Sequence, residues 1–544
     1  MQLAEASGEA DGIELTDLLL NLGDAYGKSG DLGAAIEADQ RAIELLTDRL
    51  PPGDPALVTS LAALADLQRA AHRFDAAEAT LQRILDIQQA AYGPNSDHVL
   101  ATLGKLQQLY ADAAWPEDAA RIEKAIEAAS LKQRELPATP AATDRARRYR
   151  ASNGFATVRV FYGTNRKPTG ERMPALFYGG GRGDLQYGYV DVSIPETHKE
   201  GELETQSRWS VLTYFMGADA LKRRFVLLQD VRPLSSSSFA GALRSQITGA
   251  PSRDVFIFVH GFNSSFEDAA RRTAQLAYDL DFDGTPMMYS WPSQASTAAY
   301  TVDEAAVGIS GRRMADFLKT VLEQSGAERV HLIAHSMGNR ALMEALQTYL
   351  AERPARRARK AFGQIVFTAP DVDRDYFSDA IEPLRAVADR VTLYASSNDL
   401  ALRTSQAIHG APRAGLGGDG ILIAPGIDSI DMSEVQADMI GHNYYAANSG
   451  AIYDLFRILW RGDPPPRRCG MVDRKRGAAS FWLFKVSQCK GTELLEAGVL
   501  VKRFGAQARE RVRARLQALT DPAQKQEWTG ILSRLNELLN APLN

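Results

Sequence analysis

The chain has 544 residues, which is enough for about three domains of ordinary size. Hydrophobic residues make up 45% and charged residues 24%, a composition typical of a globular protein rather than a disordered one. The formal net charge is −5 at pH 7, and no apolar run approaches the roughly 20 residues that a membrane-spanning helix needs. We therefore expect a folded chain without a membrane span.

The first residues, Met1 to Asp17, are polar and acidic and lack the basic and then apolar segments of a signal peptide. The chain has two cysteines, Cys469 and Cys489, which cannot build a metal site by themselves. They flank a strand-like run over residues 480–486, so a disulfide could close a small hairpin, but we favour two free thiols. We expect a cytoplasmic protein; a disulfide or a truncated N-terminus would favour the periplasm.

Residues 14–130 are predicted to form a repeat array. Similar segments begin at Leu22, Leu64 and Leu106, with an offset of 42 residues in both cases. Each contains an apolar helical stripe, a short turn and the alanine-rich start of a second stripe, so each should form a pair of helices. The pattern resembles tetratricopeptide repeats (TPRs) of the kinesin-light-chain-like type, which stack helix pairs into a solenoid.

This array is acidic. Residues 1–130 contain 22 Asp and Glu against 9 Lys and Arg, a net charge of −13. Such a surface repels phosphates, so we expect no nucleic acid partner. We expect a protein or peptide to bind in the TPR groove. The alternative is that the array only dimerises the chain or packs on its own catalytic domain.

Residues 131–153 are turn-rich and basic, and are predicted to be a linker. From residue 154 to 462, strand-like and helix-like runs alternate, which is typical of a mostly parallel, doubly wound sheet. A glycine-rich loop is expected at 179–183. Strands are expected at residues 157–162, 186–194, 224–228, 254–259, 286–289, 330–334, 364–368 and 390–395. In such sheets the active site lies at the carboxyl ends of the strands.

The most informative stretch runs from Val330 to Arg340. A strand-like run ends at Ala334, Ser336 follows in a tight turn, and a helix-like run starts at Arg340. This is the pattern of a nucleophile elbow, G-x-S-x-G, with Ala334 in place of the first glycine. Small residues are needed two positions away on either side, because the turn holds the serine in a strained conformation close to its neighbours.

Ser336 is therefore the candidate nucleophile, and its partners should follow other strands. Asp399 comes after the strand predicted at 390–395, and His442 comes later, before a predicted helix. The order Ser336, Asp399, His442 is that of the triad in α/β-hydrolases. The backbone N–H groups of Phe262, in the loop after the strand at 254–259, and of Met337 are expected to form the oxyanion hole.

Other acids and histidines compete for these roles. Asp371 and Asp373 also follow a strand, but one strand earlier than the usual acid. His409 is the alternative base, and lies in a stretch that we predict to be a glycine-rich loop. His260 and His331 are predicted to be structural histidines.

Six short motifs recur through the sheet region: Tyr162-Gly-Thr-Asn-Arg166, Phe258-Val-His-Gly-Phe-Asn263, Ser290-Trp-Pro-Ser293, Ala334-His-Ser-Met-Gly-Asn-Arg340, Ala369-Pro-Asp-Val-Asp373 and Ser397-Asn-Asp399. As a set they resemble a bacterial alpha/beta-hydrolase family formerly labelled a domain of unknown function (DUF900). The resemblance covers residues 156–462 and implies an esterase- or lipase-like fold, with Ser336, Asp399 and His442 as the triad. Tyr300 and Asp303 would line the pocket.

Residues 463–544 depart from this pattern, and are predicted to form a hairpin and helices at about 505–519 and 522–539. The overall prediction is an α/β-hydrolase fold between an all-α TPR solenoid and a small hairpin with a helical tail. We expect a serine hydrolase that acts on a small ester or acyl substrate, most simply a carboxylic ester, without a metal or organic cofactor. The alternatives are a TPR-based scaffold with a hydrolase-like domain, or an acyltransferase, thioesterase or amidase on the same triad.

Overall fold

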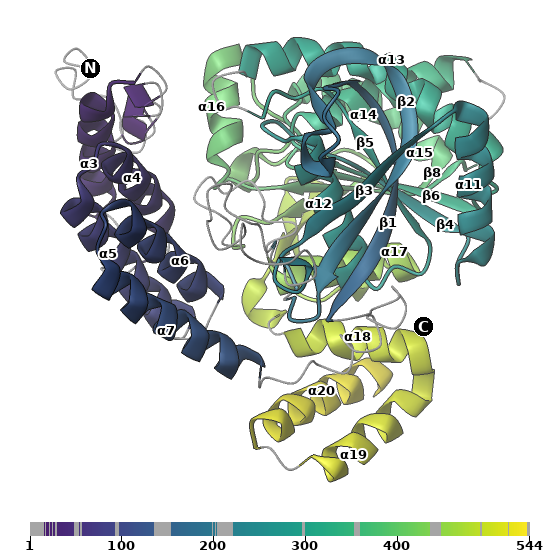
Figure 1. Cartoon of the computed structure of the whole chain (residues 1–544). Helices are drawn as coiled ribbons and strands as arrows, with labels where there is room; N and C mark the ends of the chain where they lie inside the picture. Colours follow the sequence, from purple (N-terminus) through teal and green to yellow (C-terminus); the bar gives the residue numbers. More distant parts are fainter. Residues whose placement is uncertain are drawn as a thin grey trace. The chain divides into compact units, whose positions relative to one another are not determined.

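A computed structural model of the chain (Figure 1) describes residues 16, 18–20, 22–23, 26–27, 30–47, 54, 57–92, 97–134, 154–198, 200–201, 203, 221–295, 300–352, 360–435, 448–489, 492–519 and 522–540. These residues belong to two compact units. One unit contains the helices of the repeat array, and the other contains the remaining elements.

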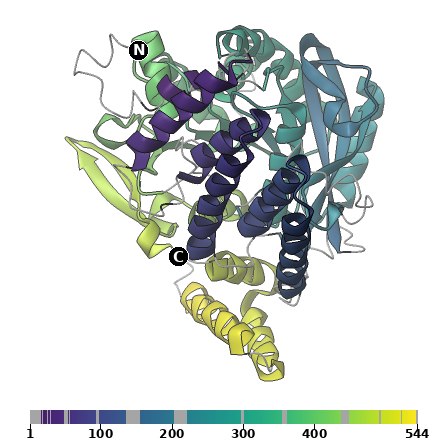
Figure 2. The ribbon, with the colours of Figure 1, turned by 60° about the vertical axis from the view of Figure 1, so that its left-hand side comes forward.

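The helices of the repeat unit pack against one another in chain order (Figures 1 and 2). They are α3 (Leu32–Thr47), α4 (Val58–Ala70), α5 (Phe74–Tyr92), α6 (Asp97–Asp112) and α7 (Pro116–Arg134). The second helix of each pair begins at Leu32, Phe74 or Pro116, which reproduces the offset of 42 residues predicted from the sequence. Their apolar stripes, with Ile36 and Leu106 among the buried residues, meet in one core. The predicted TPR-like helix pairs are confirmed.

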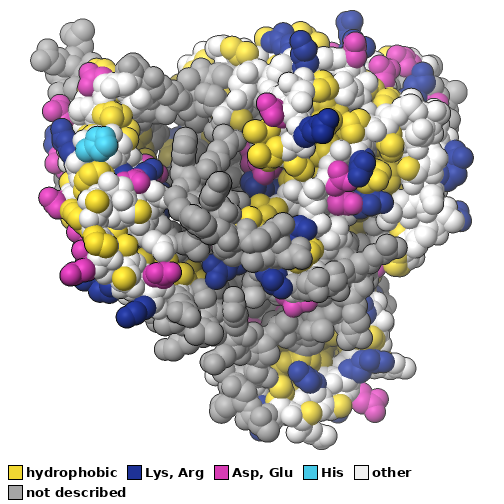
Figure 3. Space-filling view, in the orientation of Figure 1, with side chains coloured by type: hydrophobic (Ala, Val, Ile, Leu, Met, Phe, Trp, Pro, Cys, Tyr) yellow, Lys and Arg dark blue, Asp and Glu magenta, His cyan; other side chains and the backbone are white. Residues whose placement is uncertain are grey.

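The turn inside each helix pair has the same backbone shape. Gly30, His72 and Ala114, again 42 residues apart, have positive φ angles of 86°, 57° and 57°. In each turn the next residue donates its N–H to a carbonyl five positions earlier, as Trp115 does to Tyr110 at 2.8 Å. The repeat is thus encoded in the turns as well as in the helices. Acidic side chains recur along the outer edge of this unit (Figure 3).

The second unit is built around an 11-stranded sheet (Figure 1). The strands are β1 (Phe155–Pro168), β2 (Tyr178–Pro195), β3 (Leu227–Leu234), β4 (Asp254–Val259), β5 (Thr285–Ser290), β6 (Arg329–His335), β7 (Phe362–Thr368), β8 (Ala388–Ala395), β9 (Asp428–Asp431), β10 (Met471–Arg476) and β11 (Ala479–Phe484). Their spatial order is β10-β11-β9-β8-β7-β6-β4-β5-β1-β2-β3. The pairs β1–β2, β2–β3 and β10–β11 are antiparallel and the other seven are parallel, so the predicted mostly parallel sheet is confirmed.

Helices cover both faces of this sheet. They are α11 (Ser236–Gly249), α12 (Phe266–Asp279), α13 (Tyr300–Gln324), α14 (Gly338–Glu352), α15 (Arg374–Val387), α16 (Leu400–His409) and α17 (Ser449–Arg461). Helices α12 and α17 pack with Phe256 and Phe258 of β4, whereas α11, α13, α14 and α15 pack with Val255, Ile257 and Val259. Because both sets of alternating side chains are buried, β4 is apolar along almost its whole length.

Two of the predicted elements in this unit are wrong. The glycine-rich stretch at 179–183 is part of β2 rather than a loop. Its missing side chains allow close contacts, since a Cβ at Gly180 would lie 2.8 Å from Oε1 of Gln294. The third strand was expected at 224–228 but runs over Leu227–Leu234, where antiparallel pairing with β2 sets its register.

The C-terminal hairpin of β10 and β11 extends the sheet, because β11 pairs in parallel with β9. A disulfide joins Cys469 and Cys489 at the base of this hairpin, so the expectation of two free thiols is wrong. Helices α18 (Thr492–Phe504), α19 (Ala508–Ala518) and α20 (Pro522–Asn540) follow, and the last two correspond to the predicted helices. None of the helices in the described part of the chain is long and apolar enough to cross a membrane.

The domain boundaries drawn from the sequence at residues 130, 153 and 462 stay predictions. The predicted linker falls largely on residues 135–153, which lie outside the described residues.

Candidate active site

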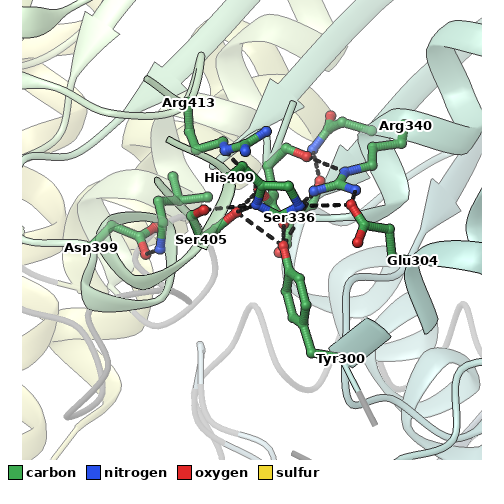
Figure 4. Close-up of polar contacts among 11 residues, drawn as sticks. Tyr300, Glu304, Ser336, Arg340, Asp399, Ser405, His409 and Arg413 are labelled. Atoms are coloured by element: carbon green, nitrogen blue, oxygen red, sulfur yellow. Dashed lines mark hydrogen bonds and ion pairs between the residues drawn. The ribbon is translucent and has the colours of Figure 1, made fainter. Parts of the chain in front are cut away.

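Ser336 lies in the turn between β6 and α14 (Figure 4), as the elbow pattern predicts. Its φ angle is 50°, a left-handed conformation that is unusual for a residue other than glycine. The turn is fixed from both sides: the N–H of Ser336 donates to the carbonyl of Thr368 at 3.0 Å, and its carbonyl accepts from the N–H of Asn339 at 3.1 Å. A strained serine in a turn between strand and helix, held by surrounding hydrogen bonds, is the backbone geometry that the elbow pattern predicts; the role of Ser336 as a nucleophile stays a prediction.

The loop after β4 is pressed against this turn. A Cβ at Gly338 would lie 2.2 Å from the carbonyl oxygen of His260, and a Cβ at Gly261 would lie 2.8 Å from the Cβ of Ser336. Neither contact is sterically possible, so both positions require glycine. Ala334, where the elbow pattern usually has glycine, is fully buried in β6 and fits without such a clash.

The two positions predicted for the oxyanion hole lie on either side of Ser336. Met337 is buried at the start of α14, and Phe262 directly follows Gly261, the residue that touches the elbow. The ring of Phe262 packs edge-on against Tyr300, with 5.3 Å between the ring centres. The two backbone segments therefore meet at Ser336, while the positions of their N–H groups relative to a substrate stay a prediction.

His260 has the structural role predicted for it. Its Nδ1 lies 2.8 Å from the carbonyl oxygen of Gly261, and its Nε2 lies 3.1 Å from the hydroxyl of Ser290. The carbonyl can only accept, so Nδ1 carries the proton and Nε2 accepts. The ring stacks on Trp291 and is buried. Burial, together with the nearby Arg166 guanidinium, lowers the pKa of His260 to about 3, so the imidazole is neutral near pH 7.

Arg166 ties the loops around the site together. Its guanidinium is buried and donates to the hydroxyl of Ser290 and to the carbonyls of Gly179, Ser264 and Ser293. These acceptors lie in the loop after β4, at the end of β5 and in the loop that follows it, and in β2. Burial lowers the pKa of Arg166 to about 9, which still leaves it charged at neutral pH. The sequence had marked Arg166 only as part of a family motif.

Asp399 follows β8 and is the N-cap of α16. It is fully buried, and its carboxylate accepts the N–H of Leu402 at 3.0 Å. This places an ionisable acid at the carboxyl end of β8, where the triad acid is expected. The predicted base, His442, lies outside the described residues, so its position relative to Ser336 and Asp399 stays a prediction.

The rival candidates have other contacts. Asp373 is the N-cap of α15 and accepts the N–H groups of Asp375 and Tyr376. The prediction that His409 lies in a loop is wrong: His409 is the last residue of α16. Its Nδ1 lies 2.7 Å from the Ser405 carbonyl oxygen and its Nε2 lies 2.8 Å from Glu304 Oε1, so neither nitrogen is directed at Ser336.

Beside the elbow lies a group of hydrogen-bonded polar residues, which we call the polar cluster (Figure 4). Its members are Tyr300, Glu304, Arg340, Asp371, Ser405 and His409. The cluster touches the elbow through Asp371, whose N–H donates to the Ser336 carbonyl at 3.3 Å. Burial alone would raise the pKa of Asp371, but Arg340 and the hydroxyls of Ser405 and Tyr300 hold it below its usual value.

Sequence reasoning identified only part of this cluster. Tyr300 was expected near the pocket, and its hydroxyl donates to Asp371 at 2.6 Å. Asp303 was expected there too, but it is buried and accepts from the side chain of Ser293 and the N–H of Gln294, so it fixes the loop after β5. Glu304 and Ser405 were missed, because single polar residues on helices give no signal in the sequence.

The fold and this site define an α/β-hydrolase domain. Residues 235–458 match the model of a family described as "Alpha/beta hydrolase of unknown function (DUF900)". The resemblance stated from the sequence is confirmed over this range, which contains five of the six motifs; Tyr162-Gly-Thr-Asn-Arg166 lies before it. The comparison with curated proteins gives no match.

Two solved structures are similar to the N-terminal repeats. One is the crystal structure of BtubC (BKLC) from P. vanneervenii, with 20% identity and a TM-score of 0.21 over 26% of this chain and 58% of that chain. The other is a putative kinesin light chain with nearly identical TPR-like repeats from Podosopora anserina, with 19% identity and a TM-score of 0.20 over 25% of this chain and 65% of that chain. This chain thus spans less than two thirds of either structure.

The glycine contact at the elbow predicts a specific loss of stability. Gly338→Ala should lower the free energy of unfolding by about 1–3 kcal/mol, because the new Cβ would meet backbone atoms that cannot move aside. Gly308→Ala is the matched control: nothing lies within 4 Å of its Cβ, and in the middle of α13 it should raise the stability by about 0.5–1 kcal/mol. Denaturant unfolding measures both, and equal effects of the two changes would contradict the packing described here.

The lowered pKa of His260 predicts that the stability of the protein depends on pH. Its pKa is about 3 in the folded protein and about 6.5 when unfolded, so between these values the unfolded chain binds the additional proton. The unfolding free energy should therefore fall as the pH is lowered, by about 2 kcal/mol from this group between pH 7 and pH 5. Urea unfolding of the wild type and of His260→Gln across this range measures how much His260 contributes to the pH dependence of the unfolding free energy. Equal pH slopes in the two proteins would show that His260 does not carry it.

Proposed function

We propose that this protein is a serine hydrolase in which Ser336 is the nucleophile. One observation carries the proposal: Ser336 is held at φ 50° between β6 and α14, with Gly261 and Gly338 in close contact around it. This strain has a cost of about 1–2 kcal/mol, and such strain is retained mainly where it serves function. The match of residues 235–458 to an α/β-hydrolase family supports the same conclusion.

In the proposed mechanism, Ser336 Oγ attacks the carbonyl carbon of an ester while His442 accepts the serine proton. Asp399 orients the imidazole and stabilises its charged form. The N–H groups of Phe262 and Met337 would hold the developing oxyanion, and one such donor is worth about 3 kcal/mol in known enzymes. His442 then protonates the leaving alcohol, and water attacks the acyl-enzyme to release the acid.

The assignment of Asp399 rests on its place at the end of β8 and on its complete burial. Asp371 is the weaker candidate, because Tyr300, Ser405 and Arg340 already bind both of its carboxylate oxygens. His409 is the weaker base, since Ser405 and Glu304 bind both of its nitrogens. His442 is therefore the base that we propose.

A carboxylic ester is the substrate class that we propose, because its cleavage needs no group beyond this triad and oxyanion hole. Thioesters and amides react on the same arrangement, so a panel of all three classes is the appropriate first screen. The TPR-like unit is proposed to bind a protein or peptide partner. Its acidic composition, with a net charge of −13 over residues 1–130, favours a basic one.

Removal of the nucleophile should abolish activity. We expect Ser336→Ala to lose both covalent labelling by a fluorophosphonate probe and hydrolysis of a short 4-nitrophenyl ester, because the attacking oxygen is absent. Ser378→Ala is the matched control, since this partly buried serine lies on α15 and bonds only a carbonyl of its own helix. Labelling of Ser336→Ala at the wild-type rate would exclude Ser336 as the nucleophile.

The catalytic role proposed for Asp399 can be separated from its structural role as the N-cap of α16. Asp399→Asn keeps a side-chain oxygen for the N–H of Leu402 but removes the charge, so α16 should form while kcat falls by a factor on the order of 10⁴. Asp373→Asn makes the same change at the N-cap of α15 and should leave kcat within about threefold. Steady-state kinetics on a 4-nitrophenyl ester compares them, and equal losses would refute the proposed role.

A further inference from the structure

Arg413 is a buried cation whose one ion pair among the described residues is a loose contact with Asp371. It lies in the segment after α16, and only 4% of its side-chain surface is exposed. Among the described residues, no group accepts a hydrogen bond from its guanidinium, and its Nε is fully buried without a partner. Its nearest opposite charge is Asp371, with 3.7 Å between Nε and Oδ1, which is too long for a hydrogen bond.

This arrangement is unusual because the neighbouring charged groups, Arg340 and Asp371, have several hydrogen-bond partners each. Arg340 donates to the carbonyl and carboxylate of Asp371, to Glu304 and to the hydroxyl of Tyr300. Asp371 in turn has its oxygens occupied by Ser405, Tyr300 and Arg340. Buried donors without partners are costly, and a guanidinium normally fills its planar fork with a carboxylate or phosphate. The open fork of Arg413 therefore requires an explanation.

The backbone places Arg413 next to the elbow. Its segment runs beside residues 372–374. The N–H of Ala414 donates to the carbonyl of Val372 at 2.9 Å, and the backbones of Arg413 and Asp373 form an isolated antiparallel β-bridge. Asp371, in the same neighbouring segment, donates its N–H to the carbonyl of Ser336. Figure 4 shows Arg413 approaching the polar cluster, to which Arg340 belongs, with Ser336 drawn close by.

We propose that Arg413 binds a carboxylate of the substrate, so that Ser336 hydrolyses esters that carry a second, ionised carboxyl group. This inference rests on the function proposed above. The two N–H groups at the end of a guanidinium match the two oxygens of a carboxylate, and this pairing would satisfy donors that the protein leaves open. The reaction itself stays an ester hydrolysis: water supplies the OH of the released acid and the H of the released alcohol.

Arg340 does not compete with Arg413 for this role. Its donors are already occupied by Asp371, Glu304 and Tyr300, and a ligand would have to displace these contacts. Arg413, by contrast, donates no hydrogen bond among the described residues, so a ligand there would displace none. A substrate with a neutral chain would leave these donors without an acceptor in a buried site, so the wild type should discriminate against it.

The test compares pairs of esters that differ only in a carboxylate. One pair, 4-nitrophenyl hydrogen glutarate and 4-nitrophenyl pentanoate, places the charge in the acyl part; a second pair, 4-carboxyphenyl and phenyl butyrate, places it in the alcohol part. The wild type should prefer the charged member of one pair in kcat/KM by about 10- to 100-fold, the range expected for a charged hydrogen bond. Arg413→Gln should abolish this preference within each pair.

Arg403→Gln is the matched control, because Arg403 is exposed on α16 and its loss changes the net charge equally. Arg413→Lys, which keeps the charge but not the fork, should give an intermediate preference. Should the Arg413 variants fail to fold, the wild type still decides: glutarate should inhibit hydrolysis of the neutral ester competitively, and the neutral pentanamide should not. A wild type that cleaves neutral and charged esters equally would overturn the proposal.

A binding measurement separates this inference from the proposed activity. Calorimetric titration of glutarate into Ser336→Ala should show one site, and Ser336→Ala/Arg413→Gln should lose it. Binding without any esterase activity in the wild type would refute the proposed hydrolase but support the carboxylate site. Esterase activity with equal rates on both members of each pair, and no glutarate binding, would refute the carboxylate site alone.

Discussion

The functional part of this molecule depends on one close contact: the loop after β4 lies directly against the turn after β6. The two strands are neighbours in the sheet and parallel, so their carboxyl ends meet at one edge. At that edge Gly338 meets the carbonyl of His260, and Gly261 meets the Cβ of Ser336. The absence of two side chains is what allows a serine at φ 50° and a donor-bearing backbone loop to share the same small volume.

Around this contact, polar groups replace the apolar core that covers the rest of the sheet. On one side, Arg166 and the neutral His260 hold the loops after β4 and β5 in place with hydrogen bonds to Ser290 and to backbone carbonyls. On the other side, Asp371 and Arg340 form the centre of the polar cluster. Nearly all these donors and acceptors are paired, so the site is rigid in the sense that moving one group breaks several bonds. Within the described residues, the guanidinium of Arg413 donates no hydrogen bond, and this is the observation on which the proposed carboxylate site rests.

The structure of the repeat unit depends mainly on local sequence. Its helices, its turns and its positive φ angles all recur every 42 residues, so local sequence determines most of its structure. Its acidic surface and the basic remainder of the chain give the two units opposite charge, which bears on the choice of partners rather than on the fold.

The sequence by itself determined the elements whose signal is local. The apolar run of β4 and the Ser336 elbow followed from patterns within about ten residues, the repeats followed from an offset of 42 residues, and its place after a predicted strand marked Asp399 as the acid to examine. The tertiary structure alone decided the rest, because it depends on contacts between distant segments: the register of β3 against β2, the pairing of β11 with β9, the disulfide of Cys469 with Cys489. It also brought Arg413, Asp371 and Tyr300 together, which no spacing along the chain could indicate, since each belongs to a different element and only the folding of the sheet makes them neighbours.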